Sequence, residues 1–154
     1  MKKNILIFIF LHCLINLNAE NKLTQAFAAE NNGQYTTAFN LYTQAIKDMS
    51  LSFDYRTEAR INKALMYLTN ELGRPNYIHG RKLLLNILRD SRISPVNKGK
   101  VLYNIAELYQ DGLGVKKSNE IALAFYNQLI NLHGANPGDI EAAKQAVRLI
   151  NKKP

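Results

Sequence analysis

The stretch that decides the fold runs from Leu102 to Gly134 and reads LYNIAELYQDGLGVKKSNEIALAFYNQLINLHG. Two runs, 101–110 and 121–132, carry apolar residues three or four positions apart and flank a loop that contains two glycines. Spacing of this kind predicts amphipathic helices. Gly112 suits the left-handed end of the first helix, and Ser118 suits the N-cap of the second. The stretch therefore predicts a helical hairpin.

The apolar pattern of this hairpin returns every 42 residues. Small residues recur at Ala38, Gly80 and Ala122, and upstream Ala64 and Tyr67 align with Ala106 and Tyr109. Further apolar residues stay in step at Tyr42, Leu84 and Tyr126, then at Ala45, Ile87 and Leu129. A single hairpin cannot bury its apolar face, so about three must stack. We expect three units, at about 22–50, 56–90 and 98–134, with a shorter internal loop in the first.

The last part of the chain predicts a capping helix over 137–151. Pro137 suits an early helical position, and Asp139 and Glu141 place acidic groups in the first turn. One apolar stripe follows, formed by Ile140, Ala143, Val147 and Ile150. Such a helix would seal the last repeat against water. The sequence thus predicts an all-α fold: an α/α superhelical solenoid of about three antiparallel helix hairpins plus a C-terminal capping helix.

The third unit resembles a Sel-one-like repeat, a subclass of the tetratricopeptide superfamily. The residues that carry this resemblance are Tyr109, Gly112, Gly114, Val115, Ala122, Tyr126 and Gly134, in that order. Residues 33–45 resemble the second half of an ordinary tetratricopeptide unit, and the middle unit is the most degenerate. The resemblance implies a right-handed stack of antiparallel helix pairs, whose first helices line a concave surface that holds peptides or partner proteins.

On that geometry, partner contacts fall on the first helix of each unit. In the third unit they are Tyr103, Glu107 and Gln110; Arg60 and Lys63, with Arg56, are expected to form a basic rim. The corresponding residues of the second unit are Ile61, Leu65 and Leu68. They form either an apolar groove floor or part of the core, and the core is favoured because an apolar stripe normally faces the interior. The residues expected to pack the repeats are Ala38, Tyr42, Ala64, Tyr67, Gly80, Ala106, Tyr109, Gly112, Gly114, Ala122 and Tyr126.

The N-terminus predicts export. Lys2 and Lys3 precede an apolar run over 5–15, and Ala19 is small, which is the layout of a signal peptide cleaved after residue 19. The apolar run is shorter than the roughly 20 residues that span a bilayer, so no transmembrane segment is expected in the domain 20–154. Cleavage would remove Cys13, the single cysteine, and lower the formal net charge from +8 to +6, because Lys2 and Lys3 are lost.

Sites of catalysis are not apparent in the sequence. His79 and His133 lack partners at metal-ligand spacing, and Gly112-Leu113-Gly114 lacks the third glycine of a dinucleotide loop. We therefore expect no enzyme activity, no cofactor, no metal and no nucleic-acid partner.

The positive charge favours acidic partners, although a solvated basic surface explains it better. The expected function is a non-catalytic interaction module, in the bacterial envelope or secreted, that binds a protein or peptide in its concave groove. The alternative is a basic module that binds an anionic envelope polymer such as peptidoglycan. A β-lactam-directed enzyme is less favoured. The cysteine-rich relatives linked to β-lactams carry a disulfide in each repeat, whereas the single cysteine of this chain, Cys13, precedes the repeats.

Overall fold

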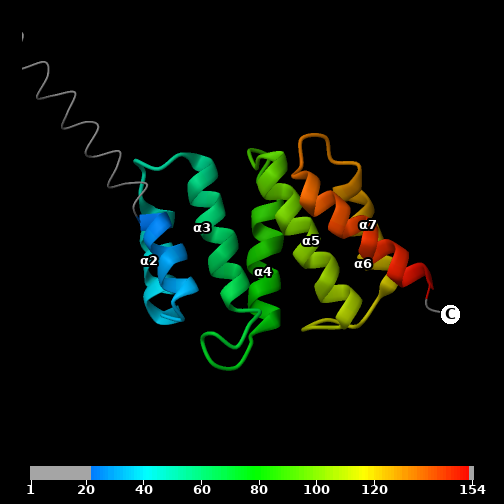
Figure 1. Ribbon diagram of the computed structural model, residues 1–154, viewed down its shortest axis with the longest axis horizontal. Helices are drawn as coiled ribbons and strands as arrows, with labels where there is room; N and C mark the ends of the chain where they lie inside the picture. The colour runs from blue at the N-terminus through cyan, green and yellow to red at the C-terminus, as the bar shows by residue number, and fades with distance from the viewer. Residues whose placement is uncertain (1–21, 153–154) are drawn as a thin grey trace, which may run out of the picture. The chain divides into compact units, whose positions relative to one another are not determined.

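The computed structural model describes residues 22–152, and this part of the chain contains helices and no strand (Figure 1). Residues 22–31 are helical. The helices that follow are α2 (Tyr35–Lys47), α3 (Phe53–Met66), α4 (Tyr77–Leu88), α5 (Pro95–Asp111), α6 (Asn119–Ile130) and α7 (Pro137–Lys152). The predicted all-α fold is confirmed. The predicted signal peptide lies outside the described residues.

The helices begin at a regular interval along the chain. One series, α2, α4 and α6, begins at residues 35, 77 and 119, and the other, α3, α5 and α7, begins at residues 53, 95 and 137. Successive members of each series are 42 residues apart. The period predicted from side chains is therefore a period of whole helices. Because α7 starts in step with α3 and α5, it occupies the place of a unit's first helix as well as that of a cap.

Serine caps mark where α5 and α6 begin. Ser118 accepts a hydrogen bond from the N–H of Ile121 at 3.2 Å, as predicted, and Ser94 accepts one from the N–H of Asn97 at 3.4 Å. The predicted starts of the second and third units, at residues 56 and 98, are three residues late. The apolar pattern missed the first turn of α5, which begins with Pro95 directly after the cap. Proline is favoured there, because the first helical N–H has no partner within the helix.

By its internal contacts the chain divides into two compact parts, which differ from the three repeats. The N-terminal part ends at Lys63 and the C-terminal part begins at Ala64, so the boundary falls within α3. In the N-terminal part, Tyr42 of α2 is fully buried, and its ring lies edge-on to Phe27 with the centroids 5.8 Å apart. The Tyr42 hydroxyl donates a hydrogen bond to the carboxylate of Glu30. Only residues 32–34 separate the two helical segments, which confirms the shorter loop predicted for the first unit.

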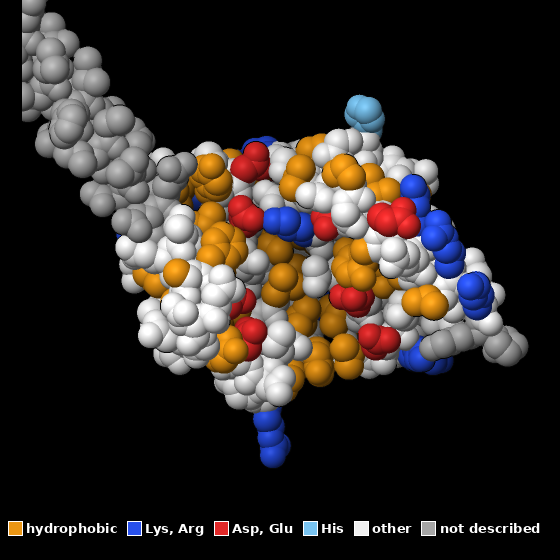
Figure 2. All heavy atoms as spheres, in the orientation of Figure 1, with side chains coloured by type: hydrophobic (Ala, Val, Ile, Leu, Met, Phe, Trp, Pro, Cys, Tyr) orange, Lys and Arg blue, Asp and Glu red, His pale blue; other side chains and the backbone are white. Residues whose placement is uncertain are grey.

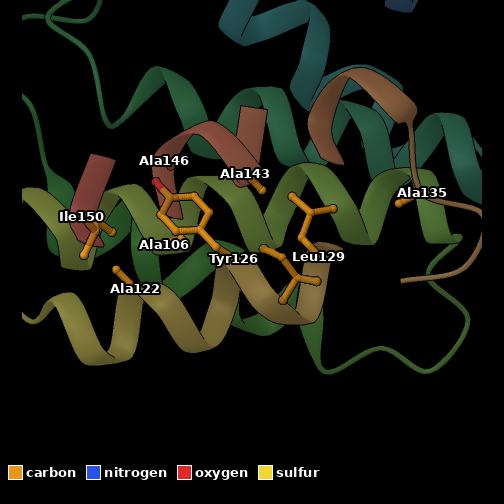
Figure 3. Packing of buried hydrophobic residues seen from close by; sticks show 9 residues of the cluster. Ala106, Ala122, Tyr126, Leu129, Ala135, Ala143, Ala146 and Ile150 are labelled. Carbon is orange, nitrogen blue, oxygen red and sulfur yellow. The ribbon is translucent and has the colours of Figure 1, made fainter. Parts of the chain in front are cut away.

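In the C-terminal part, α5 packs against α4, α6 and α7, and α6 also packs against α7. A buried cluster joins the last three of these helices (Figure 3). Its members are Leu102 and Ala106 of α5, Ala122, Tyr126 and Leu129 of α6, Ala135, and Ala143, Ala146 and Ile150 of α7. The alanines allow the helix axes to approach closely, because a larger side chain would separate them. The C-terminal helix therefore covers the apolar face of the last hairpin.

The glycine loop between α5 and α6 is held tightly. Gly112 has φ 74° and forms the left-handed C-cap of α5, as predicted. Gly114 also has a positive φ, and a Cβ atom there would lie 2.7 Å from the Cβ of Tyr77. The loop thus passes too close to the start of α4 for any side chain at this position. None of the helices in the described part of the chain is long and apolar enough to cross a bilayer.

Candidate binding site

Three of the predicted contact residues lie along one face of α5. Tyr103, Glu107 and Gln110 are spaced four and three residues apart, which places their side chains one above the other on a helix. All three are half-buried. We call them the α5 cluster. It combines an aromatic ring, a carboxylate and a carboxamide on a surface that solvent still reaches.

Tyr126 of α6 supports the α5 cluster from within the core. Its hydroxyl donates a hydrogen bond to Oε1 of Gln110 at 3.0 Å, and its ring lies edge-on to Tyr103 with the centroids 5.6 Å apart. Figure 3 shows Tyr126 projecting from α6 toward the neighbouring helices. Burial, with a further contribution from Glu107, raises the pKa of Tyr126, so its phenol remains a neutral donor. This arrangement fixes the position of Gln110 and restrains Tyr103.

The electrostatic environment of the α5 cluster is acidic. Burial raises the pKa of the Glu107 carboxyl, a hydrogen bond with Tyr103 opposes the rise, and Asp111 adds to it. Burial, Glu107 and Asp139 raise the pKa of Tyr103. The charged groups responsible for both shifts are carboxylates. Figure 2 shows acidic side chains beside hydrophobic ones over α5. An approaching cation would relieve the cost of keeping these carboxylates ionised.

Asp139 contributes a carboxylate from the first turn of α7. Its Oδ2 atom is buried, and no hydrogen-bond partner for it lies within residues 22–152. A buried carboxylate oxygen without a donor is costly, because water no longer solvates it. The negative potential at the α5 cluster therefore comes from α7 as well as from α5.

The other two predicted contact residues, Arg60 and Lys63, belong to α3, within the N-terminal part of the chain, and are half-buried. The Nζ atom of Lys63 lies 4.6 Å from the centroid of the Phe39 ring. Burial, and then Lys47, lower the pKa of Lys63. Arg56 donates a hydrogen bond from its guanidinium to the carbonyl of Leu51 at 3.0 Å. The side chains of Lys63 and Arg56 are thus engaged in contacts within the N-terminal part of the chain.

Of the three apolar residues expected on the first helix of the second repeat, one is buried and two are half-buried. Ile61 is 1% exposed, which confirms the favoured interpretation at that position. Leu65 and Leu68 are half-buried. A Cβ atom at Gly80 would lie 2.4 Å from Cδ2 of Leu68, so this leucine covers the small residue of α4.

The residues expected to pack the repeats fall into two groups. Seven are buried: Ala38, Tyr42, Ala64, Gly80, Ala106, Ala122 and Tyr126. Tyr67, Tyr109, Gly112 and Gly114 are half-buried and lie in or beside the hairpin loops.

Tyr67 and Tyr109 make the same backbone hydrogen bond in successive repeats. The carbonyl of Tyr67 accepts a hydrogen bond from the N–H of Asn76 at 2.7 Å, and the carbonyl of Tyr109 accepts one from the N–H of Ser118 at 2.8 Å. Their rings also meet aromatic partners from the second helix of the hairpin: Tyr67 lies edge-on to His79, and Tyr109 stacks on Phe125. The two tyrosines therefore close equivalent loops 42 residues apart.

Sequence reasoning missed a groove of about 450 Å³ between α5 and α6. Its apolar lining comes from Leu102, Ala124 and Leu132. Its polar lining comes from Lys98, Asn127, Gln128 and Asn131. We call this the α5–α6 groove. The prediction considered only the first helix of each repeat, whereas five of the seven lining residues lie on the second helix or directly after it. A signal was present, because residues 121–132 contain no charged side chain.

Comparisons with known proteins assign no family to this chain. No protein-family model matches it, and no match is found among curated proteins or among solved structures. The Sel-one-like resemblance therefore rests on the residues quoted above. Within residues 22–152, no three His, Cys, Asp or Glu side chains gather as metal ligands would.

Proposed function

We propose that this protein is an exported, non-catalytic module of Sel-one-like repeats that binds a partner protein or peptide through its helical surface. The α5 cluster is the observation that carries the proposal. A tyrosine, a glutamate and a glutamine lie half-exposed on the first helix of a hairpin, supported from inside by Tyr126. Aromatic and hydrogen-bonding groups on a rigid support are typical of protein-binding surfaces.

The partner presents a cationic side chain to the α5 cluster. Glu107 is half-buried and its pKa is raised, so its ionised form lacks full solvation. A lysine or arginine that docks beside Glu107 replaces the lost water with an opposite charge. The net positive charge of the chain would by itself favour acidic partners. At this surface the local carboxylates outweigh that average, because electrostatic interactions weaken over about 10 Å in salt.

The first experiment identifies the partner and the surface together. A photoreactive residue in place of Glu107 is compared with the same residue in place of Glu120, which is exposed on α6. Crosslinking in living cells followed by mass spectrometry should give a discrete partner from position 107 and not from position 120. Equal crosslinking to the same proteins from both positions would contradict binding at the α5 cluster.

The second experiment tests the charge. Glu107→Gln and Glu120→Gln remove the same charge, but only the first lies in the α5 cluster. Glu107→Gln should weaken partner binding by about 10- to 100-fold, because a charge-assisted hydrogen bond contributes about 1.5–3 kcal/mol. Binding to the Glu120→Gln variant should stay within about twofold of the wild type. Equal losses in both variants would show that binding depends only on net charge.

The anionic-polymer alternative rests on the net positive charge and on exposed lysines such as Lys116 and Lys117. It predicts sedimentation of the protein with peptidoglycan sacculi and complete loss of binding at moderate salt. Charge reversal at Lys116 and Lys117 should then abolish binding, whereas Glu107→Gln should not weaken it. Turnover of a β-lactam by the purified chain would instead overturn the non-catalytic assignment.

Export is tested by fractionation. The wild-type chain should be recovered outside the cytoplasm in a form shortened at residue 19. A variant with Lys2 and Lys3 replaced by glutamate should remain inside the cell at full length, because the positive charge that precedes the apolar run is lost. Recovery of the full-length wild type in the cytoplasm would contradict this part of the proposal.

A further inference from the structure

The outward surface of α6 differs from an ordinary solvated helix face. Ala124, Asn127, Gln128 and Asn131 are all exposed, and none carries a charge. Ile121, on the same helix, is 40% exposed. Charged residues make up 21% of the chain, yet residues 121–132 contain none. Depletion of charged residues is the compositional signal of the centre of a binding interface.

The matching surface of α4 shows that the repeat does not require this composition. Lys82 lies 42 residues before Ala124, and Arg89 lies 42 residues before Asn131. Both are exposed. These positions therefore tolerate the charges that solvent favours, and the neighbouring repeat does not cover them. Packing of the repeats gives no reason for the uncharged surface of α6.

We propose that the α5–α6 groove is a second binding site, which holds an extended peptide segment of a partner with an acidic side chain placed against Lys98. This site lies on other residues than the α5 cluster and takes the opposite charge. It does not depend on the function proposed for that cluster. Its volume of about 450 Å³ falls within the range of roughly 300–1,000 Å³ found for ligand pockets.

Charge complementarity selects the acidic group. Lys98 is the one charged residue in the lining of the groove, it is half-buried, and no ion pair joins it to another residue of the described chain. A carboxylate that reaches Lys98 forms a charge-assisted hydrogen bond at a partly desolvated position. The apolar floor, which includes the fully buried Leu102, accommodates small apolar side chains beside the acidic one.

The carboxamides select an extended peptide backbone. Each carboxamide offers both a donor and an acceptor, as a peptide unit does. Asn127 and Asn131 are one turn apart on α6, about 6 Å along its axis. This spacing is close to the roughly 6.6 Å between alternate residues of an extended strand. The side chain of Asn131 already donates to the carbonyl of Asn127 at 2.9 Å, which leaves its oxygen to accept a hydrogen bond from a peptide N–H.

The probes are fluorescent hexapeptides of alanine and valine, acetylated and amidated, with one central aspartate, asparagine or lysine. Blocked ends restrict the carboxylate to the side chain. Fluorescence anisotropy with the whole chain should show saturable binding of the aspartate peptide, about tenfold tighter than that of the asparagine peptide. Lys98→Gln should remove this preference. Lys144→Gln, which changes an exposed lysine of α7 outside the groove, should preserve it.

Two further measurements locate the site. Ala124→Glu places a bulky carboxylate in the groove. This group has the same charge as the aspartate of the peptide and should abolish binding of that peptide. Circular dichroism should show an unchanged fold, because Ala124 is exposed. In NMR spectra, the aspartate peptide should shift the backbone amides of 124–132. Glu107→Gln should leave these shifts and the affinity unchanged, so failure of this inference is distinguishable from failure of the proposed function.

Several results would overturn the inference. One is equal affinity for the aspartate and asparagine peptides. Another is equal loss of binding in the Lys98→Gln and Lys144→Gln variants, and a third is amide shifts centred on the α5 cluster. Absence of saturation by every peptide at millimolar concentration would do the same. A soluble saccharide that shifts the same amides with higher affinity than the aspartate peptide would assign the groove to sugars.

Discussion

Ala122→Asp tests the packing of the third hairpin most directly. Ala122 is fully buried on α6 and belongs to the cluster that joins α5, α6 and α7. The cluster members drawn nearest to it are Ala106 of α5 and Ile150 of α7 (Figure 3). A carboxylate at this position loses its water and meets apolar surface. The added atoms also push apart helices whose approach depends on small residues.

Two terms set the magnitude. An uncompensated buried charge costs about 3–5 kcal/mol, and overpacking of a filled core adds about 1–3 kcal/mol. The sum is comparable with the roughly 5–15 kcal/mol that stabilises an ordinary domain. We therefore expect Ala122→Asp either to unfold the C-terminal part of the chain or to lower its Tm by more than about 15 °C.

The measurement is thermal and urea unfolding at pH 7, followed by far-ultraviolet circular dichroism. Ala124→Asp is the matched control, because Ala124 lies on the same helix and is exposed. The control should change the free energy of unfolding by about 0.5 kcal/mol or less. The difference between the variants should shrink at pH 3, where the introduced carboxyl is protonated. Equal Tm values for both variants at pH 7 would refute the packing described here.

Three other changes test the loop, the cap and the α5 cluster. Gly114→Ala should cost about 1–3 kcal/mol in thermal unfolding, because φ is positive and the new Cβ would meet Tyr77; a Tm equal to the wild type would contradict this. Ser118→Ala should cost about 1 kcal/mol in urea unfolding, since the N–H of Ile121 loses its acceptor, and a negligible change would disprove the role of the cap. The raised pKa of Glu107 means that the folded state holds this proton more tightly than the unfolded state. The protonated Glu107 side chain therefore stabilises the fold at pH values below its pKa in the unfolded state. This stabilisation is lost as the pH rises through its pKa in the folded state. Glu107→Gln should be more stable than the wild type at pH 7 and similar to it at pH 4, and parallel pH profiles would rule this out.

The sequence predicts the helices well because each of their determinants is local. Periodic apolar residues identify the buried faces, and Gly112 and Ser118 mark the ends of the loop. The predicted starts of the second and third units fall three residues late because each first helix begins directly after a serine cap, Ser52 before α3 and Ser94 before α5. The signal there is the Ser94-Pro95 pair, which hydrophobic periodicity does not register.

The candidate sites were less predictable, because they depend on which side chains from different helices meet. Family geometry placed Tyr103, Glu107 and Gln110 on one face, but the support from Tyr126 and the negative potential from Asp139 arise only when α6 and α7 dock. The α5–α6 groove requires an antiparallel neighbour as well. Its sequence signal was an absence of charge on α6, and this becomes informative only when those residues are seen to be exposed.

The regular spacing of the helix starts has an evolutionary consequence. In the later repeats each helix begins directly after its own polar cap, so a DNA duplication of residues 94–135 would insert a segment that holds both Ser94 and Ser118. The extra copy would offer its neighbours the same apolar surfaces that they already accept. Such a protein can therefore lengthen by whole copies, and each copy can then acquire its own surface chemistry, as the contrast between α4 and α6 illustrates.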